Sequence, residues 1–264
     1  MPPNPRDFML DALALLWPVA CVACGVADRE LCAACRAALH AQRTKVIDVR
    51  APSGVRVRAA GAYEDPVRAV LLAYKHQGMT GLAKPLAGRL IEPLLRAAAG
   101  ECSMADSWMA GQQARRLEAR APEVVLIAAP SRRARVRERG YHHIELLVSA
   151  LLRELRSRGV AAGFRAFPHA LRTGRGRTAQ VGLTAVERER NAARVTVRAR
   201  ARSELAGASV VLIDDVVTTG ATARAAIEAL DSAGARVLGT VALCVVRRRD
   251  AELVQHGEIQ VETR

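Results

Sequence analysis

The chain has 264 residues, a hydrophobic fraction of 50% with 3% aromatic residues, and a formal net charge of +14 at pH 7. This length suits one α/β domain with a sizeable core and a small appendage, and it argues against a large multidomain enzyme. The high apolar content excludes a wholly disordered chain, and no run of about eighteen apolar residues predicts a membrane span.

The first apolar segment, residues 8–20, is interpreted as a short amphipathic helix that ends at Pro18. A secretory signal is the alternative. However, Asp11 interrupts the apolar stretch, and the negative charge of Asp7 offsets the positive charge of Arg6. The apolar stretch therefore lacks the positively charged segment that precedes the apolar core of a secretory signal. We therefore expect a chain that is not exported and that lies in the cytoplasm.

Two C-x-x-C pairs follow, in the segments CVACG and LCAAC, with seven residues between them. The four cysteines are Cys21, Cys24, Cys32 and Cys35. Four thiolates at this spacing predict a closed, structural zinc site. The alternatives are two disulfides or four unconnected cysteines, and disulfides suit an exported chain better. Cys102 and Cys244 lack paired spacing, and Cys244 is expected in the core because its surroundings are apolar.

Alternating and periodic patterns predict an α/β body after this module. In chain order, the expected elements are a strand at 55–63, helices at 66–74 and 82–96, an inserted loop at 100–122, a strand at 123–128, a basic loop at 131–140 and a helix at 144–158. The strand EVVLIA at 123–128 is continuously apolar, as in a parallel sheet buried on both faces. We expect residues 1–50 to form the zinc module and residues 51–264 to form the main domain.

The second β-loop-α-β unit has the clearest pattern. An apolar strand at 210–213 leads into a polar turn, DDVVTTGAT at 214–222, then a helix at 222–233 with Gly234 as its C-cap, and a last strand at 237–246. The predicted fold is therefore a parallel sheet flanked by helices. Ligands of such sheets bind beyond the carboxyl ends of the strands, where the acidic turn and the basic loop both emerge.

The turn offers two kinds of group for a phosphorylated sugar. Asp214 and Asp215 supply adjacent carboxylates for a ribose diol, directly or through a hydrated divalent cation. The segment from Thr218 to Thr222 supplies hydroxyls and the free N–H groups of a helix N-terminus for a phosphate. Together they suggest a ribose-5-phosphate cradle, although an acidic turn capped by threonines is the simpler alternative.

The segment IDDVVTTGAT resembles the phosphoribosyl-pyrophosphate (PRPP) motif of type I phosphoribosyltransferases, and the chain as a whole resembles the ComF/ComFC competence-type family. Four further segments carry the likeness: LLWPVACVACG with LCAAC, AYEDPVRAVLLAYKHQG, RRARVRERGYHHIELL and RTAQVGLTAVERERN. They occur in the family's order along the chain. The resemblance implies a type I phosphoribosyltransferase fold with an N-terminal zinc module.

The resemblance also implies roles for individual residues. Asp214 and Asp215 would bind the ribose hydroxyls, and the basic segment would bind the pyrophosphate, bridged to the sugar by Mg²⁺. The remaining expected PRPP ligands are Thr218, Thr219, Gly220, Ala221 and Thr222 for the 5′-phosphate, and Arg135, Arg137, Arg139 and Gly140 for the pyrophosphate. Arginine forks suit phosphate oxygens, and Arg139 is the favoured catalytic arginine beside the two aspartates.

The sequence departs from the family pattern at two places. His142 and His143 stand where the pattern has Asn-Gln, and His76 stands where it has Tyr. The two imidazoles could donate hydrogen bonds or move protons beside the phosphate segment, or they could be ordinary surface residues. Thr218 stands where oxopurine phosphoribosyltransferases have an Asp that handles a purine proton, and a threonine cannot be that base.

Two functions are compatible with these features. The first is a Mg²⁺-dependent phosphoribosyltransferase that acts on an unknown acceptor. The second is a PRPP-sensing or single-stranded-DNA-handling protein of natural transformation, with a helicase-like partner, as the family's link to competence implies. Residues 131–140 and 172–202 hold eleven of the fourteen excess positive charges, which suits a polyanion. The scarcity of aromatic residues argues against a surface on which single-stranded bases could stack.

If PRPP binds at the acidic turn, exchanging both Asp214 and Asp215 for Asn is expected to abolish PRPP binding and to leave the fold intact.

Overall fold

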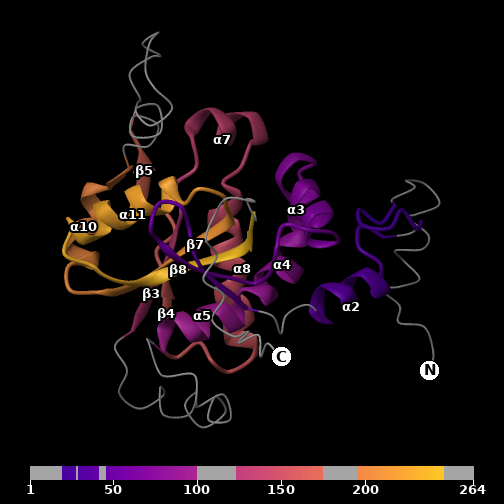
Figure 1. Ribbon diagram of the computed structural model, residues 1–264, viewed down its shortest axis with the longest axis horizontal. Helices are drawn as coiled ribbons and strands as arrows, with labels where there is room; N and C mark the ends of the chain where they lie inside the picture. Colours follow the sequence, from indigo (N-terminus) through magenta and orange to yellow (C-terminus); the bar gives the residue numbers. More distant parts are fainter. Residues whose placement is uncertain (1–19, 28, 42–45, 100–122, 175–194, 247–264) are drawn as a thin grey trace, which may run out of the picture.

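The computed structural model describes residues 20–27, 29–41, 46–99, 123–174 and 195–246 (Figure 1). The expected inserted loop at 100–122, Cys102 and nearly all of the expected N-terminal helix lie outside these residues. So does the RTAQVGLTAVERERN segment at 177–191.

A six-stranded sheet forms the centre, in the order β1-β2-β8-β7-β3-β4. Its strands are β1 (Ile47–Arg50), β2 (Arg56–Ala59), β3 (Val124–Ala128), β4 (Phe164–Ala166), β7 (Ser209–Val217) and β8 (Arg236–Val245). Every neighbouring pair is parallel except β1 with β2 at one edge. A separate antiparallel pair joins β5 (Leu171–Thr173) to β6 (Val195–Val197). The predicted α/β class with a mostly parallel sheet is confirmed.

Helices cover this sheet and connect its strands (Figure 1). They are α2 (Ala33–Ala41), α3 (Val67–His76), η2 (Thr80–Leu82), α4 (Ala83–Arg89), α5 (Ile91–Ala98), α7 (Arg133–Arg139), α8 (His143–Ser157), α10 (Ala199–Leu205) and α11 (Ala221–Asp231). Helix α8 packs on β3, β4 and β7, whereas α5 packs on β2, β7 and β8. Helix α11 contacts β7 and β8, the two strands that it connects.

The core forms where the apolar patterns predict it. All five residues of β3 are buried, because strands lie on both sides of it and helices cover it. Helix α8 buries Leu147, Leu151 and Leu155 on one face. Cys244 is fully buried, as its apolar surroundings predict. Burial of this continuous apolar surface stabilises the fold and fixes the positions of the strand ends.

Two expectations about helices are wrong. The single helix expected at 82–96 is divided into α4 and α5, which meet at Leu90. Pro93 lacks the N–H that would continue the hydrogen-bond ladder, so a new helix starts just before it.

The basic loop expected at 131–140 contains α7, which ends at Gly140 in a left-handed conformation with φ of +81°. Arginine and alanine have high helix propensity, and α7 buries no residue, so no apolar periodicity announces it.

The turn expected at 214–222 is wrong in its first half. Strand β7 continues to Val217, so Asp214 and Asp215 belong to the strand itself. Val216 pairs with Cys244 and Val217 with Val245 on β8, which extends the ladder past the aspartates. The β-branched valines favour this extended conformation. The turn proper therefore comprises Thr218 to Gly220, directly before α11.

The N-terminal segment lies at one side of the molecule, where α2 contacts α4 (Figure 1). Arg89 of α4 is 1% exposed and donates hydrogen bonds to the carbonyl oxygens of Leu39 on α2 and Ala60 after β2. This arginine links the segment to the sheet. The division at residue 50 stays a prediction, and β1 before that point already belongs to the main sheet.

No helix in the described ranges has the length and apolar character to cross a membrane.

Candidate functional site

Asp214 and Asp215 lie near the carboxyl end of β7 and are 8% and 5% exposed. Asp215 faces α3 and α8, whose side chains contact it. In the described residues, the recorded hydrogen bond to the Asp214 carboxylate comes from the N–H of Asp215, at 2.8 Å. The two carboxylates therefore have different environments.

Three donors surround the Asp215 carboxylate. Lys75 Nζ of α3 lies 2.7 Å from Oδ2, and His143 Nε2 of α8 lies 2.5 Å from the same oxygen. The N–H of Val216 donates to Oδ1 at 2.6 Å. With a cation and two N–H groups directed at it, Asp215 is held as a carboxylate in a buried position.

The same contacts separate the pKa values of the two aspartates. Burial opposes ionisation of Asp215, but the hydrogen bond from His143 and the positive charge of Lys75 hold its pKa far below the usual range. Burial, followed by the negative charge of Asp215, raises the pKa of Asp214 to about 7. At neutral pH, Asp215 is thus the permanent anion, and Asp214 is the carboxyl that a ligand or a cation would ionise.

Two tyrosines fix the elements that carry these donors. The hydroxyl of Tyr74, a fully buried residue of α3, donates to the carbonyl oxygen of His143 at 2.6 Å. The hydroxyl of Tyr141 donates to the carbonyl oxygen of Tyr74, and the two rings meet edge to face at 6.1 Å. These bonds join α3 to the start of α8. Burial raises the pKa of both phenols, so they remain neutral donors.

The basic segment reaches this cluster through one arginine. Arg139 Nη1, at the end of α7, lies 2.8 Å from His143 Nδ1. Arg139 Nε is buried without a hydrogen-bond partner in the described structure, so it retains a donor for an anion. Arg135 and Arg137 lie on exposed parts of α7, and Arg135 pairs with Glu138 at 3.1 Å. Arg139 therefore contacts His143, the partner of Asp215, whereas Arg135 and Arg137 remain exposed on α7.

The two histidines have different surroundings. His143 is 3% exposed and contacts Asp215, as described above. His142 has a half-exposed side chain, and its Nδ1 lies 3.3 Å from Glu145, which also pairs with His169 at 2.7 Å. Of the two interpretations that the sequence leaves open, a site position fits His143 and a surface position fits His142.

The Thr218–Gly220 turn packs against the turn between β1 and β2. The N–H of Ser53 donates to the carbonyl oxygen of Thr219 at 3.0 Å. Gly220 has φ of +76°, and a Cβ there would lie 2.7 Å from Ala51 Cβ and would overlap Ser53 Oγ. Glycine is therefore required at residue 220 by both backbone angle and space. Ser53 Oγ is itself buried and has no partner among the described residues.

Thr218 and Thr222 are exposed, whereas Thr219 and Ala221 are half-buried. Gly220 lies directly before α11, so the N-terminal N–H groups of that helix face the end of the turn. Thr219 Oγ1 accepts the N–H of Ala221 at 3.4 Å. The predicted phosphate residues are therefore contiguous at the helix N-terminus, at the same end of β7 as the aspartates.

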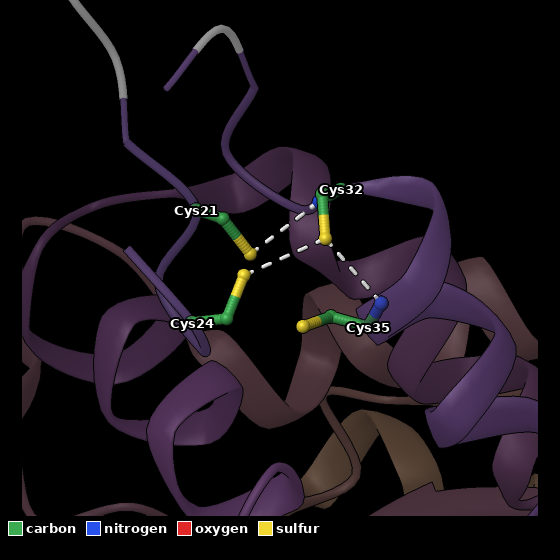
Figure 2. Close-up of side chains that lie close together, drawn as sticks. All are labelled: Cys21, Cys24, Cys32 and Cys35. Atoms are coloured by element: carbon green, nitrogen blue, oxygen red, sulfur yellow. Dashed lines mark hydrogen bonds between the residues drawn. The ribbon is translucent and has the colours of Figure 1, made fainter. Parts of the chain in front are cut away.

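The four paired cysteines come together before and at the start of α2 (Figure 2). Their sulfur atoms all lie within 4.8 Å of one another. The N–H of Cys32 donates to Cys21 Sγ at 3.4 Å, and the N–H of Cys35 donates to Cys32 Sγ at 3.4 Å. These cysteines are free thiols, so the disulfide alternative is not observed. Four sulfurs at this separation suit a tetrahedral metal ion.

The thiols differ in acidity. Burial alone would raise the pKa of Cys21, but backbone N–H groups, that of Cys32 first, lower it to about 6. Interactions with the side chains of Cys24 and Cys32 raise the pKa of Cys35 to about 12. Closely spaced thiols resist joint ionisation unless a cation is bound among them. The cluster therefore fits a metal ion, and zinc is the ion that this donor set favours.

The described residues also fit the PRPP and Mg²⁺ that the sequence implies. Asp214 has carboxylate capacity left for a sugar hydroxyl or a hydrated cation. Arg139 Nε and Ser53 Oγ are buried and unpartnered within the described ranges, and both can donate to phosphate oxygens.

Lys75 and Ser53 are the site residues that sequence reasoning did not assign, and for His143 the sequence left a site role and a surface role open. Lys75 and His143 lie in segments that carry the family likeness, but their contacts with Asp215 span 140 and 72 residues of sequence. No local pattern encodes such contacts. For Ser53, the segment Ala51-Pro52-Ser53-Gly54 is typical of a turn between strands. Nothing in this segment indicates that it packs against the Thr218–Gly220 turn.

Part of the chain is similar to known proteins. Residues 147–263 match the family model of the phosphoribosyl transferase domain. An orotate phosphoribosyltransferase from Chlorobium phaeobacteroides is 38% identical over 74 residues, which are 28% of this chain and 37% of that protein. The chain thus spans little more than a third of that curated relative.

Among solved structures, a hypoxanthine phosphoribosyltransferase from Staphylococcus aureus is similar in two crystal forms. In the tetragonal form the identity is 15%, over 51% of this chain and 58% of the other. In the orthorhombic form it is 14%, over 53% and 66%. The TM-score is 0.29 in both. The family match and the curated relative together support a phosphoribosyltransferase domain in the C-terminal part of this chain.

Proposed function

We propose that the chain is a Mg²⁺-dependent, PRPP-binding phosphoribosyltransferase of the ComF type, which transfers phosphoribosyl to an acceptor with release of pyrophosphate. One observation supports this most strongly. The buried aspartates of β7, the Gly220 turn and the N-terminus of α11 are consecutive, so carboxylates and phosphate-binding N–H groups lie at one strand end. A ribose 5-phosphate needs both.

Each group has a proposed part. Asp214 accepts hydrogen bonds from the ribose hydroxyls, while Asp215 is the fixed anion beside it. The N–H groups and hydroxyls from Thr218 to Thr222 bind the 5′-phosphate. Arg139 donates to the pyrophosphate, and Gly140 allows a close approach of the backbone.

The Asp214 carboxylate would hold a hydrated Mg²⁺, which would supply positive charge to offset that of the pyrophosphate. The protein residues bind and orient the donor. As the bond from C1 to pyrophosphate breaks, the sugar gains oxocarbenium character and negative charge gathers on the leaving group, where the guanidinium of Arg139 stabilises it. Thr218 cannot remove a proton from the acceptor, which disfavours a mechanism that depends on a base at that position.

The acceptor is best sought by measuring pyrophosphate release from PRPP with a panel of bases and nucleotides in Mg²⁺. Turnover with one acceptor, lost in Asp214→Asn, supports the proposal. Failure of the intact protein to bind PRPP in Mg²⁺ would contradict it. Zinc in the cysteine cluster and a cytoplasmic location complete the proposal.

A non-catalytic PRPP-sensing or single-stranded-DNA-handling protein is the second candidate, because α7 presents arginines that the buried site does not use. Arg133, Arg135 and Arg137 are exposed there, and α7 stands at one end of the molecule (Figure 1). PRPP binding without turnover on any acceptor favours a sensor. Retention of single-stranded DNA that weakens steeply with salt, and that falls in an Arg133→Gln/Arg137→Gln variant, favours the DNA role. A helicase-like partner would belong to that second function.

A further inference from the structure

A row of four polar side chains crosses the site, and the proposed chemistry gives no part to His143 or Lys75. Arg139 of α7 contacts His143 of α8, His143 contacts Asp215 of β7, and Lys75 of α3 contacts the same oxygen of Asp215. The row connects the end of the basic helix to the carboxylate. His143, its central member, is 3% exposed.

Hydrogen-bond roles fix the protonation of the His143 ring. Arginine has donors only, so Nδ1, 2.8 Å from Arg139 Nη1, must accept. The Asp215 carboxylate has acceptors only, so Nε2, 2.5 Å from Oδ2, must donate. A ring that accepts at Nδ1 and donates at Nε2 is neutral. A second proton, on Nδ1, would point at a guanidinium.

The other neighbours leave this arrangement intact. The ring of Tyr74 lies 6.4 Å from that of His143, centroid to centroid, and its hydroxyl is already committed to the His143 carbonyl oxygen. Lys75 contacts the carboxylate rather than the ring. The ring is therefore oriented at both nitrogens, and its backbone is oriented by Tyr74.

We propose that His143 is a positioning residue that holds Asp215 through its neutral Nε2–H tautomer and couples that carboxylate to Arg139. The coupling to ligand rests on the proposed PRPP function, whereas the tautomer does not. Arg139 uses Nη1 on the ring, and its buried Nε–H has no partner in the described structure. An anion can therefore bind Arg139 without displacing His143. Binding at α7 and the placement of Asp215 are then linked through one imidazole.

The first test reads the tautomer directly, in the full-length protein without ligand, by two-bond ¹H–¹⁵N correlation spectra of ¹⁵N-labelled histidine. We expect the His143 ring to be neutral, with the proton on Nε2. Arg139→Gln should change the ring signals, because an amide can either donate or accept at Nδ1. The matched control is Arg133→Gln, an exposed arginine of the same helix, which should leave them unchanged. A proton on Nδ1 in the intact protein, in either a neutral or a cationic ring, overturns the inference.

The second test separates positioning from packing. His143→Gln keeps a donor and an acceptor, whereas His143→Leu keeps volume alone. We expect His143→Leu to weaken Mg²⁺–PRPP binding, measured by calorimetry, by about tenfold or more, since it removes a hydrogen bond to a charged group. His143→Gln should restore most of that loss. His142→Leu, beside it on the surface, should bind as the intact protein does.

Equal weakening in His143→Gln and His143→Leu, or no weakening in either, overturns the positioning role, provided that circular dichroism shows folded variants. If the intact protein does not bind PRPP at all, the proposed function fails, and the spectra alone decide the tautomer. The two failures are therefore distinguishable.

Discussion

Lys75 and Asp215 form a buried ion pair between α3 and β7, with Nζ 2.7 Å from Oδ2. Their side chains are 15% and 8% exposed. This pair makes the two adjacent aspartates unequal. Asp215 is committed to the protein's own donors, and Asp214 is the carboxyl with capacity for a ligand. The expectation that both could be exchanged with the fold intact therefore needs separate variants.

Asp215→Asn should lower the free energy of unfolding strongly. The change leaves the ammonium of Lys75 buried without its carboxylate, and breaking such a pair from one side costs about 3–5 kcal/mol. Urea denaturation followed by circular dichroism measures this loss. Asp214→Asn is the matched control at the adjacent position and should not be destabilising at pH 8. Similar free energies of unfolding for the two variants would contradict the different roles of Asp214 and Asp215.

Asp214 should give the apo protein a specific pH dependence. Its pKa in the fold is about 7, raised from the ordinary value of 3.8 by burial and by the charge of Asp215. Between those two values the folded state holds a proton that the unfolded state has released, so this group's stabilisation is complete below about 4 and is lost as pH rises through 7. The difference in unfolding free energy between Asp214→Asn and the intact protein should therefore grow in favour of the variant from pH 4 to pH 8. Parallel pH curves would count against it.

Gly220→Ala should destabilise the turn before α11. A Cβ at φ of +76° costs about 1–2 kcal/mol, and it would also displace the Ala51–Ser53 turn. Gly54→Ala is the control, because Gly54 has φ of +85° with no atom within 4 Å of the added Cβ. Thermal melts should show a larger loss for Gly220→Ala. Equal losses would mean that the contact with Ser53 and Ala51 carries no energy.

The cysteine cluster should hold one zinc ion per chain, measured by elemental analysis of protein purified in reducing buffer. Cys24→Ser should lower that stoichiometry, since a closed site needs all four thiolates. Cys102→Ser should not change it. A zinc content near zero in the intact protein would refute a structural zinc site.

Much of the fold follows from periodicity. Strand β3 and helix α8 match their predicted ranges closely, because a continuous apolar run and an i, i+3, i+4 pattern each have one buried solution. Helix α7 escaped prediction because it buries nothing, and the paired strands β5 and β6 were not anticipated because each has only three residues. Such short or exposed elements carry too little apolar pattern to be recognised.

The sequence predicts only part of the candidate site. Asp214, Asp215 and Gly220 stand in one contiguous motif, so their proximity needed no tertiary contact. Lys75 and His143 reach Asp215 only through the packing of α3 and α8 on β7, which local sequence does not encode. The difference between the two aspartates is therefore a property of the fold.

The most direct test of the account is calorimetric titration of the full-length protein with PRPP, with and without Mg²⁺, beside Asp214→Asn. We expect saturable binding that requires Mg²⁺ and is lost in the folded variant, because Asp214 supplies the free carboxylate for the ribose hydroxyls. Absence of binding to the intact protein, or undiminished affinity in Asp214→Asn, would contradict it.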